Sequence, residues 1–203
     1  MIAERISHLI ETLQQKDYRD EDYKQLASSL ETLLNVGRIY QKRNPEVVDM
    51  VEKISICMGF DESLKNDAVY SSLIYDLGLM LVSEGVLGKK NTLSNSETNT
   101  IKIHPHTTVD LLSKIEFSER IKKSILHHHE NWDGSGYPNG LKGNQIPVIS
   151  RVLAVADAYF SMIEPRPYRP RRSPQEALYQ IRSETGSKFD PAVVTAMEES
   201  LTG

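Results

Sequence analysis

The residues best suited to chemistry form one short run, HHHENWDGSGYP, which covers residues 127–138. Imidazole is a common metal ligand, and a glycine-rich turn beside it lets the backbone approach a ligand closely. If the preceding helix continues through the histidines, Ile121 and His128 share its buried face. His128 and His129 then point about 100° apart, near or into the core, whereas His127 is expected to be solvated. Two imidazoles at a core edge are costly unless they are hydrogen-bonded or bind a metal.

Two aspartates add carboxylates in apolar surroundings. Asp157 lies within RVLAVADAYFSM, and Asp76 lies within SSLIYDLGLM. A buried carboxylate needs a cation or several hydrogen-bond donors. An isolated one is most often a structural acceptor, but two of them in a chain with several such histidines favour a metal cluster. Imidazole and carboxylate ligands together suit zinc, manganese or iron.

Four arginines crowd into the loop PRPYRPRRSP, namely Arg166, Arg169, Arg171 and Arg172. One interpretation is a solvated surface loop. The other is a phosphate or guanine site, because a guanidinium group offers planar bidentate donors. A metal beside such a loop suits a phosphodiester ligand, since the metal polarises the phosphoryl group and lowers the pKa of a bound water.

Composition limits the class of protein. A chain of 203 residues with 39% hydrophobic content is long enough for one well-buried domain. A formal net charge of −4 argues against DNA binding. The single cysteine, Cys57, excludes an internal disulfide framework. No apolar run suits a signal peptide or a membrane span, so we expect a cytoplasmic protein that does not associate with membranes.

Apolar residues recur at helical spacing along most of the chain, and no convincing alternating strand pattern is present. The sequence therefore predicts an all-α fold, with a helical extension over residues 1–28 and the main domain over residues 29–203. Helices are predicted over residues 2–13, 26–36, 45–58, 65–82, 104–115, 118–131, 147–164, 174–181 and 189–201. Ser118 and His104 are the predicted N-caps of two of them, and Ser173-Pro174 is predicted to open another. Residues 83–99 and 132–145 are predicted loops because they are rich in turn formers.

These motifs together resemble the HD-GYP family, a branch of the HD metal-dependent phosphohydrolase superfamily. HHHENWDGSGYPNGLKGNQIP, RVLAVADAYFSM, RPYR, SPQEAL and FDPAVV follow the family's pattern in order, with His104-Pro105 upstream. An ordered match of several motifs is more specific than any single short motif. The resemblance implies an all-α HD-domain helical bundle that hydrolyses cyclic di-GMP with two or three metals, often iron or manganese, bridged by a hydroxide.

The resemblance also implies which residues form the site. Carried over residue by residue, the metal ligands are Asp76, His104, His128, His129 and Asp157. Asp76 would bridge the metals if the site is active. Tyr137 would pack beside the ligand, and Arg166 and Arg169 would contact the nucleotide.

Departures from the family pattern fall in the first half of the domain. The histidine that the family has before Asp76 is Tyr75 here, which could ligate iron as a phenolate but has a reference pKa near 10. The family's phosphate-binding lysine is replaced by Leu79. Further upstream, where the family has a glutamate and a histidine one helical turn apart, this chain has Ile39 and Arg43.

These losses predict one or two divalent metals per chain (iron, manganese or zinc) rather than three. The favoured hypothesis is a degenerate bacterial HD-GYP domain with slow or absent hydrolysis. It would bind cyclic di-GMP, a related cyclic dinucleotide or a signalling protein, as a sensor or adaptor. The alternative is an active phosphodiesterase in which Tyr75 ligates iron. A purely structural domain is a third interpretation, against which the intact His128-His129 pair counts. The N-terminal helices could form a homodimer, pack on the domain or contact a regulatory protein.

Overall fold

The computed structural model describes residues 45–89, 91–112, 117–164 and 171–202, and the regular elements in these ranges are all helical. They are α3 (Pro45–Cys57), α4 (Glu62–Ile74), η1 (Leu77–Leu81), α5 (Glu84–Leu87), α6 (Asn95–Lys102), α7 (His104–Leu112), α8 (Glu119–Leu126), η2 (Gly143–Gln145), α9 (Val148–Ile163), α10 (Pro174–Ser183) and α11 (Pro191–Thr202). The all-α prediction is confirmed. The extension predicted over residues 1–28 and the helices predicted over residues 2–13 and 26–36 lie outside the described residues.

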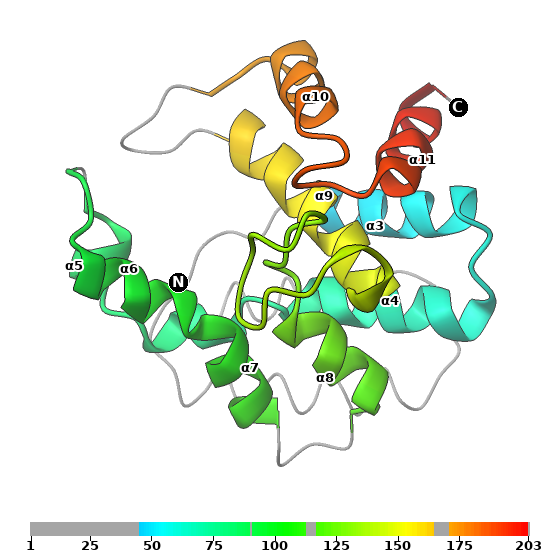
Figure 1. The fold of residues 1–203 in the computed structure, drawn as a ribbon. Helices are drawn as coiled ribbons and strands as arrows, with labels where there is room; N and C mark the ends of the chain where they lie inside the picture. The colour runs from blue at the N-terminus through cyan, green and yellow to red at the C-terminus, as the bar shows by residue number, and fades with distance from the viewer. Residues whose placement is uncertain (1–44, 90, 113–116, 165–170, 203) are drawn as a thin grey trace.

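Helix α9 crosses the centre of the bundle and contacts α3, α4, α8, α10 and α11 (Figure 1). Most of its apolar side chains are buried, and Val152, Leu153 and Val155 are at most 1% exposed. Burying one aliphatic side chain of this size contributes roughly 1.5–3 kcal/mol. Burial on this scale fixes α9 in the bundle, and with it the position of Asp157.

Side-chain caps set the start of two predicted helices. The Ser118 hydroxyl accepts a hydrogen bond from the Ile121 N–H at 3.2 Å, and α8 begins at the next residue. The Ser173 hydroxyl accepts from the Glu176 N–H at 3.2 Å, while the Glu176 carboxylate accepts from the Ser173 N–H at 2.7 Å. The cap predicted at Ser118 is confirmed, whereas the cap predicted at His104 is wrong, because His104 is the first residue of α7. A cap of this kind contributes roughly 1 kcal/mol.

The single helix predicted over residues 65–82 is wrong. Helix α4 ends at Ile74, a turn follows at Tyr75 and Asp76, and η1 then begins as a separate 3₁₀ helix. Gly78 explains the break, because a Cβ there would lie 2.3 Å from the His104 carbonyl oxygen. The close approach that glycine permits brings the turn against α7 and sets Asp76 beside its first residue.

The loop predicted over residues 83–99 is also wrong, since it contains α5 and the first part of α6. Ser94 caps α6 by accepting from the Glu97 N–H at 3.2 Å, and the Glu97 carboxylate accepts from the Ser94 N–H at 2.7 Å. The polar composition conceals these short helices. The Ser-x-x-Glu pattern of a capping box is the signal that identifies α6.

Candidate metal centre

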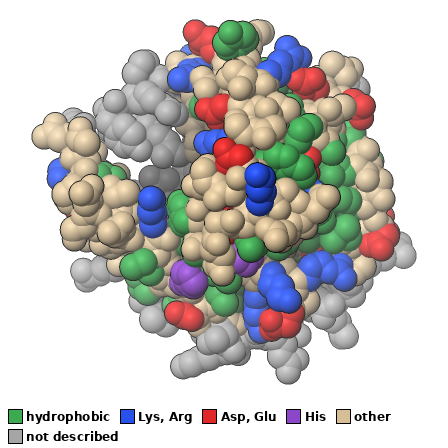
Figure 2. Space-filling model, viewed as in Figure 1, with side chains coloured by type: hydrophobic (Ala, Val, Ile, Leu, Met, Phe, Trp, Pro, Cys, Tyr) green, Lys and Arg blue, Asp and Glu red, His purple; other side chains and the backbone are tan. Residues whose placement is uncertain are grey.

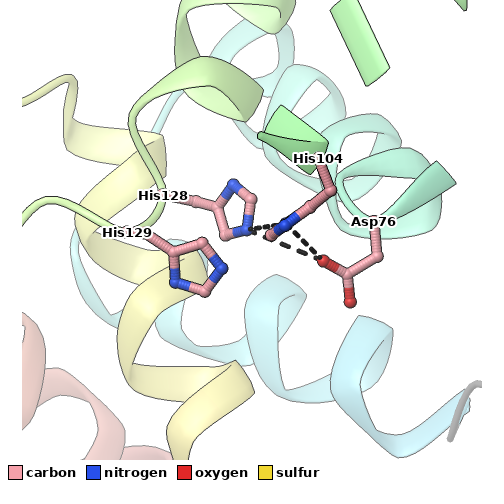
Figure 3. Close-up of side chains that lie close together, drawn as sticks. All are labelled: Asp76, His104, His128 and His129. Atoms are coloured by element: carbon pink, nitrogen blue, oxygen red, sulfur yellow. Dashed lines mark hydrogen bonds and ion pairs between the residues drawn. The ribbon is translucent and has the colours of Figure 1, made fainter. Parts of the chain in front are cut away.

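Four potential ligands meet at the junction of three helical elements. Asp76 lies in the turn between α4 and η1, and His104 is the first residue of α7. His128 and His129 come just after the C-cap of α8. Figure 3 shows their side chains pointing toward one another. One ligand atom from each residue lies within 4.8 Å of all the others. Segments far apart in the sequence thus supply a compact set of nitrogen and oxygen donors.

Thr108 holds the first two of these segments together. Its hydroxyl accepts a hydrogen bond from the Gly78 N–H at 2.8 Å and donates to the Tyr75 carbonyl oxygen at 3.1 Å. Thr108 lies one turn into α7 and is fully buried. The turn that carries Asp76 is therefore fixed to the helix that carries His104.

Backbone carbonyls orient the rings of His104 and His128. The Nδ1 atom of His104 donates to the Ile101 carbonyl at 2.8 Å, and that of His128 donates to the Ile125 carbonyl at 2.6 Å. Because a carbonyl oxygen only accepts, each neutral ring has its hydrogen on Nδ1 and a lone pair on Nε2. Such carbonyl contacts orient metal-binding histidines in many proteins.

The resulting arrangement fits a cation. The Nε2 atoms of His104 and His128 are 3.3 Å apart, and Oδ1 of Asp76 lies 3.1 Å from the first and 3.7 Å from the second. With both rings neutral, lone pairs converge on one point. His104 and His128 are only 3% and 1% exposed, so little water can reach between them. A divalent metal that accepts imidazole and carboxylate ligands satisfies these donors.

His129 completes the group and is held neutral. Burial, together with the nearby His128 and His104, lowers the pKa of His129 well below the usual value of 6.5. Its ring lies 4.0 Å from that of His128, centroid to centroid. A neutral imidazole is the form that binds a metal, so His129 needs no deprotonation at neutral pH.

The histidines do not continue helix α8, which ends at Leu126 with His127 as its C-cap. The prediction that a helix runs through this segment is therefore wrong, although His128 is buried as expected. The expectation that His127 is solvated is also wrong. Its side chain is 12% exposed, and its Nδ1 atom lies 3.4 Å from the buried Glu130 carboxylate. The end of the helix is what brings adjacent histidines to one site.

Glu130 organises the loop that follows and was not identified from the sequence. Its side chain is fully buried, and its two oxygens accept hydrogen bonds from the Asn139 N–H at 2.8 Å and the Leu141 N–H at 3.1 Å. Backbone donors to a carboxylate are strong, charge-assisted hydrogen bonds. Glu130 therefore closes the loop into a compact unit beside the histidines.

Tyr137 is brought back onto the cluster by this loop. Its N–H donates to the His129 carbonyl at 3.1 Å, and its ring stacks on the His129 ring at 4.9 Å. Gly136 permits the approach, because a Cβ there would lie 2.5 Å or less from backbone atoms of Glu130 and Asn131. Burial, and then the Asp76 and Asp157 carboxylates, raises the pKa of the Tyr137 phenol. It stays protonated and can donate a hydrogen bond.

Asp157 is not part of the four-residue cluster. Its Oδ1 atom accepts a hydrogen bond from the Tyr75 hydroxyl at 2.8 Å. Tyr75 is 4% exposed, and its ring lies 4.9 Å from that of His128. The residue that stands in place of the expected histidine is thus bonded to the carboxylate expected to bind metal.

Of the other residues expected to bind the phosphate, the nucleotide or a further metal, the structure describes Leu79. Leu79 lies in η1, half-buried, and has no charge to offer a phosphate. Arg43, Ile39, Arg166 and Arg169 lie outside the described residues, so their predicted roles stay predictions. In the ranges that the structure covers, none of the helices is long and apolar enough to cross a membrane.

Comparison with known proteins places the site in context. A family model described as "HD domain" matches residues 1–193. The "Cyclic di-GMP phosphodiesterase response regulator RpfG" of Xanthomonas campestris is 31% identical over 176 residues, 82% of this chain and 47% of that protein. A "Cyclic di-GMP phosphodiesterase" of Thermotoga maritima is 32% identical over 153 residues, 71% of this chain and 41% of that protein. The chain spans less than half the length of these curated relatives.

A solved structure shares the fold. It is described as an HDG"Y"P protein from Bdellovibrio bacteriovorus, and it matches with a TM-score of 0.67 and 14% sequence identity, over 97% of this chain and 78% of that chain. Such low identity supports the fold alone. The resemblance inferred from the motifs is confirmed by the family model and by the relatives together.

Proposed function

The chain belongs to the HD domain family, and we propose that it binds a cyclic dinucleotide at a single-metal site and hydrolyses it slowly or not at all. Its role would be that of a nucleotide sensor or protein-interaction module in bacterial cyclic di-GMP signalling. The names of the relatives support the ligand class, since both are described as cyclic di-GMP phosphodiesterases. The buried donor cluster supports the metal.

The hydrogen bond between Tyr75 and Asp157 carries the proposal of weak activity. A phenol that donates a hydrogen bond to a carboxylate keeps its proton, and a neutral phenol is a poor metal ligand. The same bond occupies one oxygen of Asp157 at 2.8 Å. Both residues are therefore engaged with each other, whereas the family resemblance expects a histidine at position 75 and a metal ligand at position 157.

The remaining residues fit a site that binds a cyclic dinucleotide but hydrolyses it slowly. Asp76, His104, His128 and His129 would hold one metal, which when bound would polarise a phosphoryl oxygen. With a single metal, attacking and leaving oxygens are not clamped on both sides. Leu79 offers no charge to the phosphate, and loss of one positioned charge can lower a rate by about 10²–10³.

Binding and turnover of cyclic di-GMP, measured on one preparation, test the proposal. Protein purified without chelator and supplied with manganese or iron is titrated with cyclic di-GMP by calorimetry, and product is followed by chromatography. We expect binding with turnover at least about 10²-fold below that of an ordinary phosphodiesterase of this family. Turnover at the ordinary rate would contradict the proposal. It would also be contradicted if the purified protein takes up no metal and binds no nucleotide.

The alternative is an active phosphodiesterase in which Tyr75 ligates iron. The observation in its favour is the preserved set of four donors, which could hold a metal that activates water. A phenolate bound to ferric iron gives an intense visible absorption band. The purified iron-loaded protein should show no such band if Tyr75 remains bonded to Asp157.

A further inference from the structure

Lys102 places a positive charge at the edge of the candidate metal centre. It is the last residue of α6, two residues before the cluster residue His104. Its ammonium lies 5.3 Å from the centroid of the Tyr137 ring. That ring stacks on His129 at 4.9 Å with an interplanar angle of 25°. One aromatic ring therefore separates the ammonium from a potential metal ligand.

Most other described lysines are paired with a carboxylate. Ion pairs of this kind involve Lys53, Lys65, Lys89, Lys122 and Lys188. Within the ranges covered by the structure, no carboxylate pairs with Lys102, whose charge stays available. Figure 2 shows basic side chains lying among acidic ones over the face in view. For binding an anionic ligand, the position of an individual lysine therefore matters more than the overall charge of this surface.

We infer that Lys102 binds a phosphate of the cyclic dinucleotide and supplies the cation that Leu79 lacks. This inference rests on the proposed function. An ammonium on a flexible stem is a compact point charge that can bind a phosphate oxygen. Lys102 reaches the site from α6, whereas Leu79 lies in η1.

Tyr137 supports this assignment from the other side of the contact. Its phenol hydroxyl can donate a hydrogen bond to a phosphate oxygen. A neutral phenol and an ammonium held together can both bind one anionic ligand. Without a ligand, the exposed ammonium lying over the ring contributes only about 0.5–1 kcal/mol.

Three variants separate phosphate binding from a structural contact. Lys102→Met removes the charge, Lys102→Arg keeps it, and Lys123→Met removes an exposed lysine from the last turn of α8 as a matched control. Metal-loaded protein is titrated with cyclic di-GMP at low and high salt, and metal per chain is measured in parallel. We expect Lys102→Met to weaken binding about 3- to 10-fold, with a smaller difference at high salt. Lys102→Arg and Lys123→Met should bind like the unmodified protein, and metal content should stay constant.

Several results would overturn the inference. If Lys102→Met binds cyclic di-GMP as well as the unmodified protein, Lys102 does not contact the phosphate, and the proposed function stands. If Lys102→Met loses metal as well as nucleotide and Lys102→Arg does not restore them, the contact is structural. If the unmodified protein binds no cyclic di-GMP, the proposed function and this inference both fail.

Discussion

The hydroxyl of Tyr75 donates a hydrogen bond of 2.8 Å to the Asp157 carboxylate, joining residues 82 positions apart in the sequence. The bond links the end of α4 to the middle of α9. It gives Asp157 a donor where the family resemblance expects a metal. Tyr75 therefore stands in place of one expected metal ligand, the histidine, and its hydroxyl is hydrogen-bonded to another, Asp157.

Removing this hydroxyl should destabilise the metal-free protein. Tyr75→Phe keeps the ring but removes one hydrogen bond to the part-buried Asp157 carboxylate, and losing one hydrogen bond costs about 0.5–1.5 kcal/mol. Urea denaturation in the presence of chelator measures the change in the free energy of unfolding. Tyr179→Phe is the control, since Tyr179 is 74% exposed, and it should shift stability by less than about 0.5 kcal/mol. Equal stability of Tyr75→Phe and the unmodified protein would show that the bond contributes nothing.

The histidine cluster is tested by two positions on one helix. His104→Gln removes a donor from the four-residue group, whereas His106→Gln changes an exposed histidine two residues later in α7. We expect the first variant to bind manganese or iron at least about 100-fold more weakly, because losing even a supporting residue outside the ligand set costs about 10- to 100-fold. The second should bind normally. Metal binding that survives His104→Gln would exclude the cluster as the metal site.

Glu130 should control the order of the loop behind the histidines. Glu130→Gln keeps the shape but weakens the hydrogen bonds from the Asn139 and Leu141 N–H groups, which should cost about 1.5–3 kcal/mol. Hydrogen exchange at these two amides should accelerate in the variant. Glu119→Gln, which breaks only a surface pair with Lys122, is expected to cost less than about 1 kcal/mol. Unchanged exchange at Asn139 and Leu141 would assign the loop's order to other contacts.

Stability should depend on the protonation of His129. Burial and the nearby histidines hold its folded-state pKa below the usual 6.5, so the unfolded chain binds the proton first. The free energy of unfolding of metal-free protein therefore falls as the pH drops below about 6.5, by at most about 1.4 kcal/mol per pH unit for one proton. Urea titrations across this range measure the slope, and His129→Asn should flatten it. An unchanged slope in the variant would assign the effect to another group.

Motifs in the second half of the chain allowed much of the site to be anticipated. The pair His128-His129 lies where the motif resemblance put it, beside His104 and Asp76. The cap at Ser118 followed from local chemistry that needs no tertiary contact.

Features that depend on tertiary packing could not be read from the sequence. The turn at Tyr75 and Asp76 depends on Gly78 fitting against α7, and an apolar run alone does not distinguish this from a continuous helix. Glu130 follows three histidines in a polar segment and has the pattern of a solvated residue. Its carboxylate can be buried because the backbone N–H groups of Asn139 and Leu141 donate hydrogen bonds to it in the folded chain. The bond between Tyr75 and Asp157 likewise exists only in the folded chain.

Metal stoichiometry in the unmodified protein and in Tyr75→His tests the central claim most directly. The claim is that the bond from Tyr75 to Asp157 limits the site to one metal. Elemental analysis of both proteins, each loaded with manganese or iron under the same conditions, gives the number of metals per chain. We expect one metal in the unmodified protein and a higher number in Tyr75→His, in which Asp157 is released and a ligand is restored. Two metals bound to the unmodified protein, or no gain in Tyr75→His, would contradict the account.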